Sequence, residues 1–327
     1  MLKLKYLVEN FDLARMALQL WPHDEATLEE RMQRFRISAN AVYPYDCGGK
    51  LCFLRLCPAQ EKTSPLIREE LRFLSLIREE GYAAMRPIPS LNGECFRTLR
   101  TPWGVWYATA FEGVPGVPLE KVALTEEIIT RYGEALGRLH RTSMDITIPP
   151  ARPSFLDLLK WTAGVMEDAP YALFRECSDI REEMLKLPRS IFSFGMIHGD
   201  FEPDNVFWDG TECHVIDFDD CMVNFFALDV VIALDELAPE AHAGFLQGYR
   251  SAYPEARVRA EDFPLMRRFR DVYQYARIKY ALSERPVPEP DWMPGLAARL
   301  EEMMNTIGER IAWERKVRRR RKLTGTP

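Results

Sequence analysis

The chain has 327 residues, of which 47% are hydrophobic and 11% aromatic, so it can bury more than one small core and is not fibrous. Its formal net charge is −6, although the segment from Arg310 onward carries eight Lys or Arg against one acid, Glu314. The seven cysteines are scattered without a C-x-x-C pair, and no stretch approaches the ~18 apolar residues of a membrane span. This composition argues against a zinc site, a secreted disulfide framework and a membrane span, and we expect a soluble, cytoplasmic protein.

The first elements along the chain predict two strands followed by a helix. Residues 34–57 contain two apolar runs on either side of the turn signal Asp46-Cys47-Gly48-Gly49, which is typical of a β-hairpin. The period changes over residues 65–80, where the apolar residues recur at helical spacing and Gly81 follows. Two more extended stretches are expected around residues 94–99 and 103–111.

The second half of the chain is mainly helical by its hydrophobic period. Helical or amphipathic stretches are expected at residues 126–140, 153–168, 224–250, 262–283 and 291–318. The Gly- and Pro-rich residues 112–118 separate these stretches from the strands before them, and we expect a linker there. The prediction is an α+β protein with a small antiparallel-sheet lobe over residues 1–112 and a larger helical lobe over residues 113–327.

Carboxylates are concentrated between residues 196 and 220. Short hydrophobic runs flank them, as expected of loops that are mounted on short buried strands. We expect three of the acids to cap turns: Asp204, Asp209 and Asp220. His198 has no Cys/His cluster around it, so a scaffolding role in its loop is favoured over zinc binding.

Three residues of this segment match the needs of phosphoryl transfer. That reaction requires a carboxylate for the proton of the acceptor hydroxyl and oxygen ligands for Mg²⁺ on the phosphates of ATP. Asp200, Asn205 and Asp217 offer these groups, with a catalytic Asp five residues before an Asn and a second Asp on the next hairpin. A Ser/His/Asp hydrolase is disfavoured because the chain has no G-x-S-x-G elbow.

The run HGDFEPDN, from His198 to Asn205, resembles the H-G-D-x-x-x-x-N signature of the aminoglycoside phosphotransferase and choline kinase family. Ile216-Asp217-Phe218-Asp219 resembles the metal-binding motif of the same family. The resemblance covers roughly residues 34–250. It implies a bilobal protein-kinase-like fold and transfer of the γ-phosphoryl group of ATP, with Asp200 as the catalytic base and Asn205 and Asp217 as Mg²⁺ ligands.

The resemblance also implies that the N-terminal lobe binds the nucleotide. Residues 38–43 resemble the polar loop between the family's first strands, so Ser38 and Asn40 are candidates for phosphate contact, with a simple strand-turn role as the alternative. Arg55 lies where kinases carry the phosphate-binding lysine. Arginine keeps the charge and can bind phosphate bidentately, but its geometry differs from that of lysine.

Partners for this cation and for adenine are assigned by position. We expect Glu70, which lies against the packed stripe of its helix, to hold Arg55, and we expect Glu69 to be solvated. Residues 107–116 resemble the family's linker, whose backbone would bind adenine, and Thr109 and Phe111 are the candidates. By the same resemblance, two further residues have structural rather than catalytic roles: His140 and Asp229.

The acceptor stays open, because the resemblance fixes the machinery for phosphoryl transfer and not the substrate pocket. A small-molecule hydroxyl is expected, of the aminoglycoside, choline, homoserine or sugar type. The alternatives are a protein Ser/Thr kinase, disfavoured because no A-P-E segment follows Asp219, and a nucleotide-binding regulator without turnover, suggested by Arg55. We expect no specific nucleic-acid partner, and a solvated helix end at the basic C-terminus. The choice of ATP or GTP and the oligomeric state are undetermined.

Overall fold

The computed structural model of the protein describes residues 1–146 and 151–324. Its contacts divide the chain into two compact units, which are described separately. The first unit comprises Met1–Val8, Pro153–Arg189 and Arg259–Pro327, and the second comprises Glu9–Arg152 and Ser190–Val258. This division differs from the expected boundary between residues 112 and 113, and that boundary stays a prediction.

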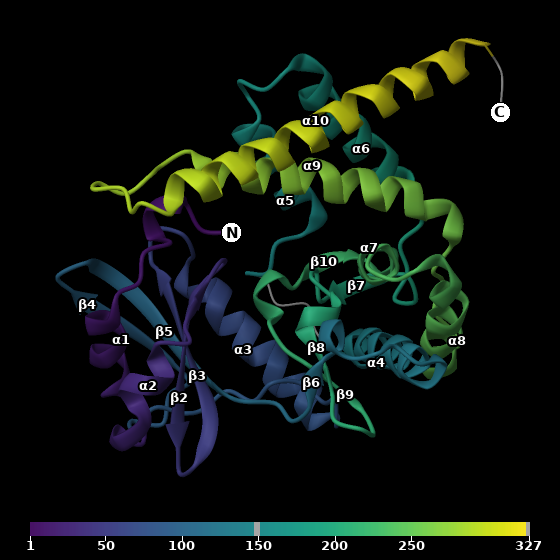
Figure 1. Ribbon diagram of the computed structural model, residues 1–327. Helices are drawn as coiled ribbons and strands as arrows, with labels where there is room; N and C mark the ends of the chain where they lie inside the picture. Colours follow the sequence, from purple (N-terminus) through teal and green to yellow (C-terminus); the bar gives the residue numbers. More distant parts are fainter. Residues whose placement is uncertain (147–150, 325–327) are drawn as a thin grey trace. The chain divides into compact units, whose positions relative to one another are not determined.

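The second unit contains a five-stranded antiparallel sheet (Figure 1). Its strands in spatial order are β1 (Arg36–Ile37), β2 (Ala41–Cys47), β3 (Lys50–Pro58), β5 (Gly104–Glu112) and β4 (Phe96–Thr101). The predicted hairpin is confirmed: β2 and β3 pair from Ala41↔Leu56 to Cys47↔Lys50. Gly48 and Gly49 form the turn with φ of 57° and 74°, which residues with a Cβ rarely adopt.

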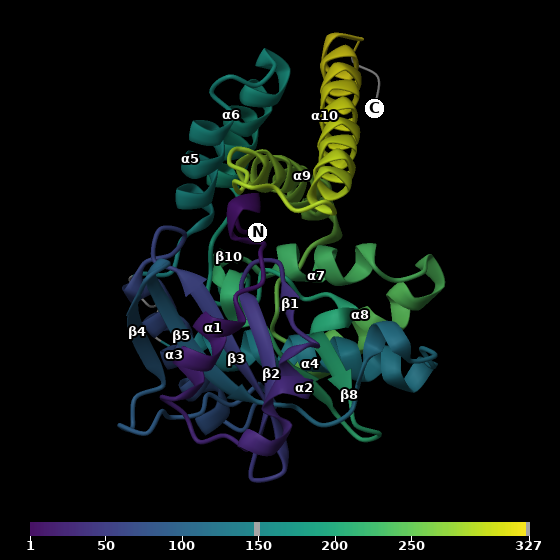
Figure 2. The ribbon, with the colours of Figure 1, turned by 60° about the vertical axis from the view of Figure 1, so that its left-hand side comes forward.

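Helix α3 (Ser64–Glu79) lies against this sheet (Figures 1 and 2). Its apolar stripe is buried, as the helical period predicts, and includes Ile67, Leu71, Leu74 and Ile77. The helix ends before Gly81, which has a φ of 80°. Two short helices that the sequence did not predict, α1 (Phe11–Leu18) and α2 (Leu28–Met32), precede the sheet.

The rest of the second unit carries the acidic segment on short strands. β7 (Phe194–Ile197) pairs with β10 (Met222–Phe225), and β8 (Val206–Trp208) pairs with β9 (Cys213–Val215) and β6 (Val117–Pro118). The short buried strands that were expected to flank the acidic residues are therefore present. The loop at 198–205 joins β7 to β8, and the loop at 216–221 joins β9 to β10, so the paired strands hold both loops.

The helices of the second unit are α4 (Glu126–Met144), α7 (Phe226–Asp235) and α8 (His242–Ala252). The helical prediction over residues 224–250 is wrong in detail, because the chain begins there as strand β10 and Pro239 separates α7 from α8. Helices α4 and α8 approach each other closely at a glycine. A Cβ on Gly248 would lie 1.9 Å from the carbonyl oxygen of Thr130, so only glycine fits this crossing.

The first unit is built from α5 (Phe155–Val165), α6 (Tyr171–Lys186), α9 (Phe263–Leu282) and α10 (Met293–Thr324). Helix α9 packs against the other three. The sequence period predicted α5, α9 and α10, but α6 was not predicted. Among the described residues, no helix is long and apolar enough to cross a membrane.

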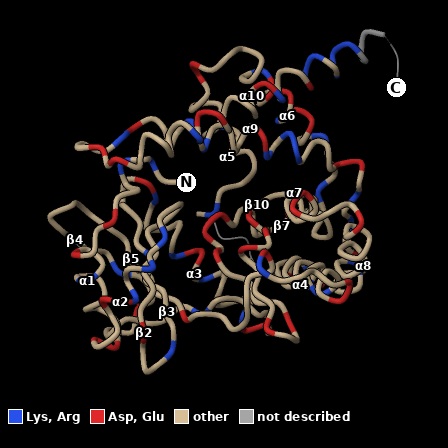
Figure 3. Tube along the Cα trace, in the orientation of Figure 1, with Lys and Arg blue, Asp and Glu red and all other residues tan. Residues whose placement is uncertain are grey.

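Basic residues gather along the last turns of α10 (Figure 3). Not all of them form the expected solvated helix end. Arg315 is only 6% exposed and pairs with Glu176 of α6, which is 1% exposed and also binds Arg268 and Arg318. These arginines therefore neutralise a buried carboxylate within the unit. The side chains of Arg321 and Lys322, which belong to the same basic run, lie outside the described residues.

Candidate active site

The loop between β7 and β8 brings Asp200 and Asn205 together. The amide nitrogen Nδ2 of Asn205 donates to the backbone oxygen and to Oδ2 of Asp200, at 3.0 Å in each case. Asn205 is 7% exposed and Asp200 is partly exposed. Because Nδ2 is committed to Asp200, the remaining polar atom of the Asn205 side chain is Oδ1, an oxygen of the kind that Mg²⁺ prefers.

A buried carboxylate on α7 anchors the start of this loop. Asp229 accepts hydrogen bonds from the backbone N–H of His198 at 2.7 Å and of Gly199 at 2.8 Å. His140 donates from Nε2 to the same carboxylate at 3.1 Å. Gly199 has a φ of 83°, and a Cβ there would lie 2.4 Å from the carbonyl oxygen of Asp220. Asp229 and His140 thus have the structural roles that were expected of them.

The His198 ring joins the two predicted motifs. Its Nε2 donates to the carbonyl oxygen of Ile216 at 2.9 Å, and its Nδ1 accepts from the backbone N–H of Asp200 at 3.2 Å. This pattern assigns the proton to Nε2. Burial lowers the pKa of His198 below its usual value, so the ring is neutral. A second hydrogen bond joins the two motifs: the backbone N–H of Ile216 donates to the backbone carbonyl oxygen of Asn205 at 3.0 Å.

Asp217 follows directly and adopts a left-handed conformation, with φ 60° and ψ 62°. It is the one described non-glycine residue with a positive φ, in a region that L-residues rarely occupy. Burial raises the pKa of Asp217, and the nearby charge of Asp219 raises it further. Such an acidic pair fits a divalent cation, which would offset the repulsion, so Asp217 and Asn205 suit Mg²⁺ by their donor atoms.

Arg55 is buried in the sheet and every nitrogen of its guanidinium has a partner. Nη1 and Nη2 donate to the two oxygens of Glu70 at 2.7 and 2.8 Å, and Nε donates to Oγ1 of Thr109 at 3.3 Å. The expected pairing of Arg55 with Glu70 rather than Glu69 is confirmed, because Glu70 is 0% exposed whereas Glu69 is partly exposed and lies near Arg72. Burial disfavours the charge of Arg55, but the carboxylates of Glu70, Asp219 and Asp217 together outweigh this effect and raise its pKa.

Thr109 and Phe111 lie within β5 rather than in a free linker. The guanidinium carbon of Arg55 is 4.9 Å from the centre of the Phe111 ring, and Thr109 accepts the Arg55 bond described above. The backbone around Phe111 is also engaged, because the N–H of Ile88 donates to Ala110 and the N–H of Glu112 donates to Arg86. The contact of Thr109 and Phe111 with adenine stays a prediction.

The turn between β1 and β2 contains Ser38 and Asn40. Ser38 is exposed, and its backbone N–H donates to the carbonyl oxygen of Asn40 at 3.0 Å. Asn40 is 4% exposed and donates from Nδ2 to Oδ2 of Asp219 at 3.1 Å. The structure therefore brings Asn40, but not the side chain of Ser38, to the acidic segment. Their contact with phosphate stays a prediction.

Lys62, in the loop between β3 and α3, was missed by the sequence reasoning. Its ammonium donates to Oδ1 of Asn40 at 3.0 Å and to Oδ2 of Asp219. Burial would lower the pKa of Lys62, but the charge and hydrogen bond of Asp219, together with Cys57, outweigh this effect and raise the pKa. A single lysine in a polar loop has no spacing that marks it as functional, so only the three-dimensional arrangement reveals this contact.

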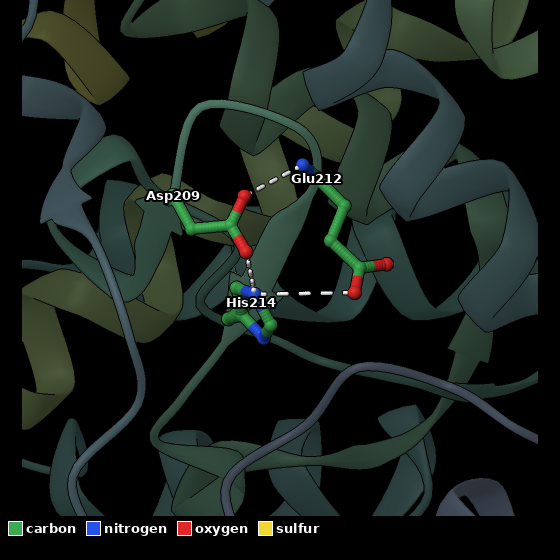
Figure 4. A group of neighbouring side chains, drawn as sticks. All are labelled: Asp209, Glu212 and His214. Carbon is green, nitrogen blue, oxygen red and sulfur yellow. Dashed lines mark hydrogen bonds and ion pairs between the residues drawn. The ribbon is translucent and has the colours of Figure 1, made fainter.

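A second group of acids lies on the turn between β8 and β9 (Figure 4). Asp209 accepts from the backbone N–H groups of Thr211 and Glu212 at 2.8 and 2.9 Å, and from Nε2 of His214 at 2.8 Å. The expected turn-capping role of Asp209 is thereby confirmed. Glu212, His214 and Asp209 could together approach one metal ion, but the hydrogen bonds of the group are those of the turn itself.

The sequence is similar to that of known proteins. The sequence profile described as "Phosphotransferase enzyme family" matches residues 47–263. The chain is 24% identical over 230 residues to amicoumacin kinase of Bacillus subtilis (strain 168), which covers 65% of this chain and 68% of that protein. It is 26% identical over 262 residues to homoserine kinase of Caulobacter vibrioides, covering 68% of this chain and 80% of that protein.

Solved structures show the same fold. The structure of an amicoumacin kinase in complex with AMP-PNP, Ca²⁺ and Ami matches with a TM-score of 0.72 and 18% identity, over 92% of this chain and 95% of that one. A microcompartment-associated aminopropanol kinase matches with a TM-score of 0.67 and 19% identity, over 94% of this chain and 98% of that one. The expected α+β, kinase-like fold is thus confirmed.

Proposed function

The chain belongs to the phosphotransferase enzyme family, and from this premise we propose that it transfers the γ-phosphoryl group of ATP to a hydroxyl of a small molecule. One observation carries the proposal. Asp200 and Asn205 are hydrogen-bonded to each other, and the loop that holds them is bonded through His198 and Asn205 to the residue before Asp217. The chemical groups that phosphoryl transfer needs are therefore fixed relative to one another by the backbone.

Each of the three residues has one task in this reaction. The carboxylate of Asp200, oriented by Asn205, accepts the proton of the acceptor hydroxyl or orients that hydroxyl toward the phosphorus. Asn205 and Asp217 hold Mg²⁺ through their side-chain oxygens. Mg²⁺, when bound, supplies positive charge to the phosphate oxygens of ATP. The buried Arg55–Glu70 pair fixes α3 to the sheet beside this site.

For the acceptor, we propose a small compound with a hydroxyl group. The relatives named as kinases of amicoumacin, homoserine and aminopropanol support this class over a protein substrate. Two of these names denote compounds that carry an amine beside the hydroxyl, so amino alcohols stand first among the candidates. We also propose the cytoplasm as the location. All seven cysteines are free, which is the state in which a reducing compartment keeps thiols.

The experiment is ATP consumption by the purified protein with Mg²⁺ across amino alcohols, aminoglycosides, sugars and a generic protein substrate, with Asp200→Ala alongside. Turnover with one small-molecule class that depends on Asp200 is the expected result. Turnover with the protein substrate alone would instead indicate a protein kinase. ATP binding without turnover on any acceptor would favour a nucleotide-binding regulator, a role that the full engagement of Arg55 makes the second candidate.

A further inference from the structure

The cation in the position of the kinase lysine is buried and bonded through each of its nitrogens. All three guanidinium nitrogens of Arg55 donate to Glu70 or Thr109, and the side chain is 7% exposed. Arg152, the other arginine at the acidic segment, donates to the carbonyl oxygens of Asp219, Cys221 and Leu66. Both arginines thus serve the fold in the described structure, and a phosphate that drew either side chain out of its place would break these bonds.

Lys62 differs from these arginines in its exposure and in the mobility of its charge. Its ammonium has three N–H donors, of which Asn40 and Asp219 take two. Its side chain is 14% exposed, twice the value for Arg55. It also ends a flexible four-carbon stem in a loop, so its charge can move over a short distance.

The position of Lys62 places this ammonium where phosphates are expected. Asn40 lies in the turn that resembles a phosphate-contacting loop, and Asp219 lies two residues after the proposed Mg²⁺ ligand Asp217. Nη1 of Arg55 is 3.9 Å from Oδ1 of Asp219, while Lys62 binds Oδ2 of the same carboxylate. The ammonium of Lys62 therefore lies next to the position that the phosphate-binding lysine of kinases occupies.

We propose that Lys62, rather than Arg55, supplies the positive charge that binds the phosphates of the nucleotide, an inference that rests on the proposed function. In the nucleotide-free protein Asp219 and Asn40 hold the ammonium in place. When the nucleotide binds, a phosphate oxygen takes the third donor of Lys62 or replaces Asp219 as its acceptor. Arg55 keeps its bonds to Glu70 throughout and acts as a positioning residue for the sheet and α3.

The competing explanation is that Lys62 only neutralises the buried carboxylate of Asp219. The two explanations differ in what the removal of Asp219 does. A neutralising lysine becomes unnecessary once Asp219 is uncharged, whereas a phosphate-binding lysine stays necessary. Both explanations can be compared without metal ions, because the proposed Mg²⁺ contacts of Asn205 and Asp217 then play no part in binding.

The test is calorimetric titration of the full chain with ATP and with adenosine in EDTA, followed by MgATP. The wild-type protein is expected to bind ATP more tightly than adenosine in EDTA, and Lys62→Met is expected to lower ATP affinity about tenfold without changing adenosine affinity. Lys50→Met is the matched control. It removes the same charge from the exposed β2–β3 turn, and both affinities are expected to stay within about twofold.

A double variant keeps the test valid if Lys62→Met alone unfolds. Asp219→Asn combined with Lys62→Met removes both buried charges, so neither is left unpaired. Relative to Asp219→Asn alone, the double variant is expected to lose about tenfold in ATP affinity in EDTA and nothing for adenosine. Equal ATP affinity of these two proteins would overturn the inference and leave Lys62 a neutralising group.

The remaining outcomes separate this inference from the proposed function. A wild-type protein that binds MgATP but shows no preference for ATP over adenosine in EDTA overturns the role of Lys62 and leaves the phosphotransferase proposal standing. A wild-type protein that binds no nucleotide with or without Mg²⁺ overturns both. If the Arg55→Lys variant binds ATP more tightly than the wild type, position 55 and not Lys62 determines the affinity for phosphate.

Discussion

Two regions of the molecule are assembled in opposite ways. One is the loop that carries Asp200, and the other is the cation cluster, formed by the side chains around Arg55 and Lys62. Asp200, Asn205 and Asp217 lie within one stretch of sequence, and hydrogen bonds of this stretch, to Asp229 and between Ile216 and Asn205, hold the loops that carry them. The second region brings together side chains from four separate segments: Asn40, Arg55, Lys62 and Glu70. A site that lies in one contiguous loop appears as a motif in the sequence, whereas a group of charged side chains from separate strands and loops does not.

The largest effect is expected at the contiguous loop. Asp200→Ala should lower kcat by about 10²–10⁴-fold with any true acceptor, because the hydroxyl loses the group that takes or orients its proton. Thermal unfolding should change little, since Asp200 is partly exposed. Asp204→Ala, in the same loop, is the matched control and should retain activity. A loss of less than tenfold in Asp200→Ala would remove Asp200 from the catalytic role.

The next effect tests the cation cluster through its buried ion pair. Glu70→Gln should lower the free energy of unfolding by about 3 kcal/mol, because it leaves the buried Arg55 without its counter-charge. Glu69→Gln, the neighbouring residue on the exposed side, should change it by less than ~0.5 kcal/mol. Urea unfolding followed by circular dichroism measures both. Equal stability of the two variants would mean that the Arg55–Glu70 pair does not hold the sheet and α3 together.

A smaller effect is expected from the anchor of the catalytic loop. Asp229→Asn keeps one acceptor oxygen but loses the charge that binds the N–H groups of His198 and Gly199, so the unfolding free energy should fall by about 2 kcal/mol. The same variant should lower kcat more than the affinity for MgATP, since the loop it anchors holds Asp200. Unchanged kcat at reduced stability would show that the loop keeps its geometry without this anchor.

The smallest effect concerns the pH dependence of the nucleotide-free protein. The pKa of Asp217 is raised in the folded state by burial and by Asp219, so its ionisation costs stability as the pH rises through the folded pKa. Asp217→Asn should therefore stabilise the metal-free protein at pH 7, on the order of 1 kcal/mol, and this gain should vanish below about pH 3, where Asp217 is protonated in both states. Asp204→Asn is the control. If the increase in the free energy of unfolding of Asp217→Asn does not depend on pH, the ionisation of Asp217 is not its cause.

Most of the sheet and of the catalytic loop could be predicted from the sequence. The β2–β3 hairpin follows from its alternation and its Gly-Gly turn, and α3 from a helical stripe that ends before Gly81. The sequence pattern was less informative where tertiary pairing overrides it. Residues 222–225 form a strand because β7 pairs with them, although the stretch that starts at residue 224 has helical character.

The candidate site was predictable only to the extent that its residues are close in the chain. Glu70 could be chosen over Glu69 because burial follows the helical period. Lys62 could not be identified, because its partners Asn40 and Asp219 are 22 and 157 positions away and no period links them. Thr109 and Phe111 were placed by analogy with a linker, and their contacts with Arg55 depend on a strand pairing that sequence does not state.

The imidazole of His198 has a consequence for how the protein responds to its surroundings. One ring bonds the N–H of Asp200 and the carbonyl that precedes Asp217, and it does so in a single tautomer that burial keeps neutral. A protonated ring would lose its acceptor for Asp200, whereas a lowered pKa postpones that change to more acidic conditions. The spacing between Asp200 and Asp217 is therefore insulated from moderate acidification of the surroundings, even though histidine is the side chain most often used to sense it.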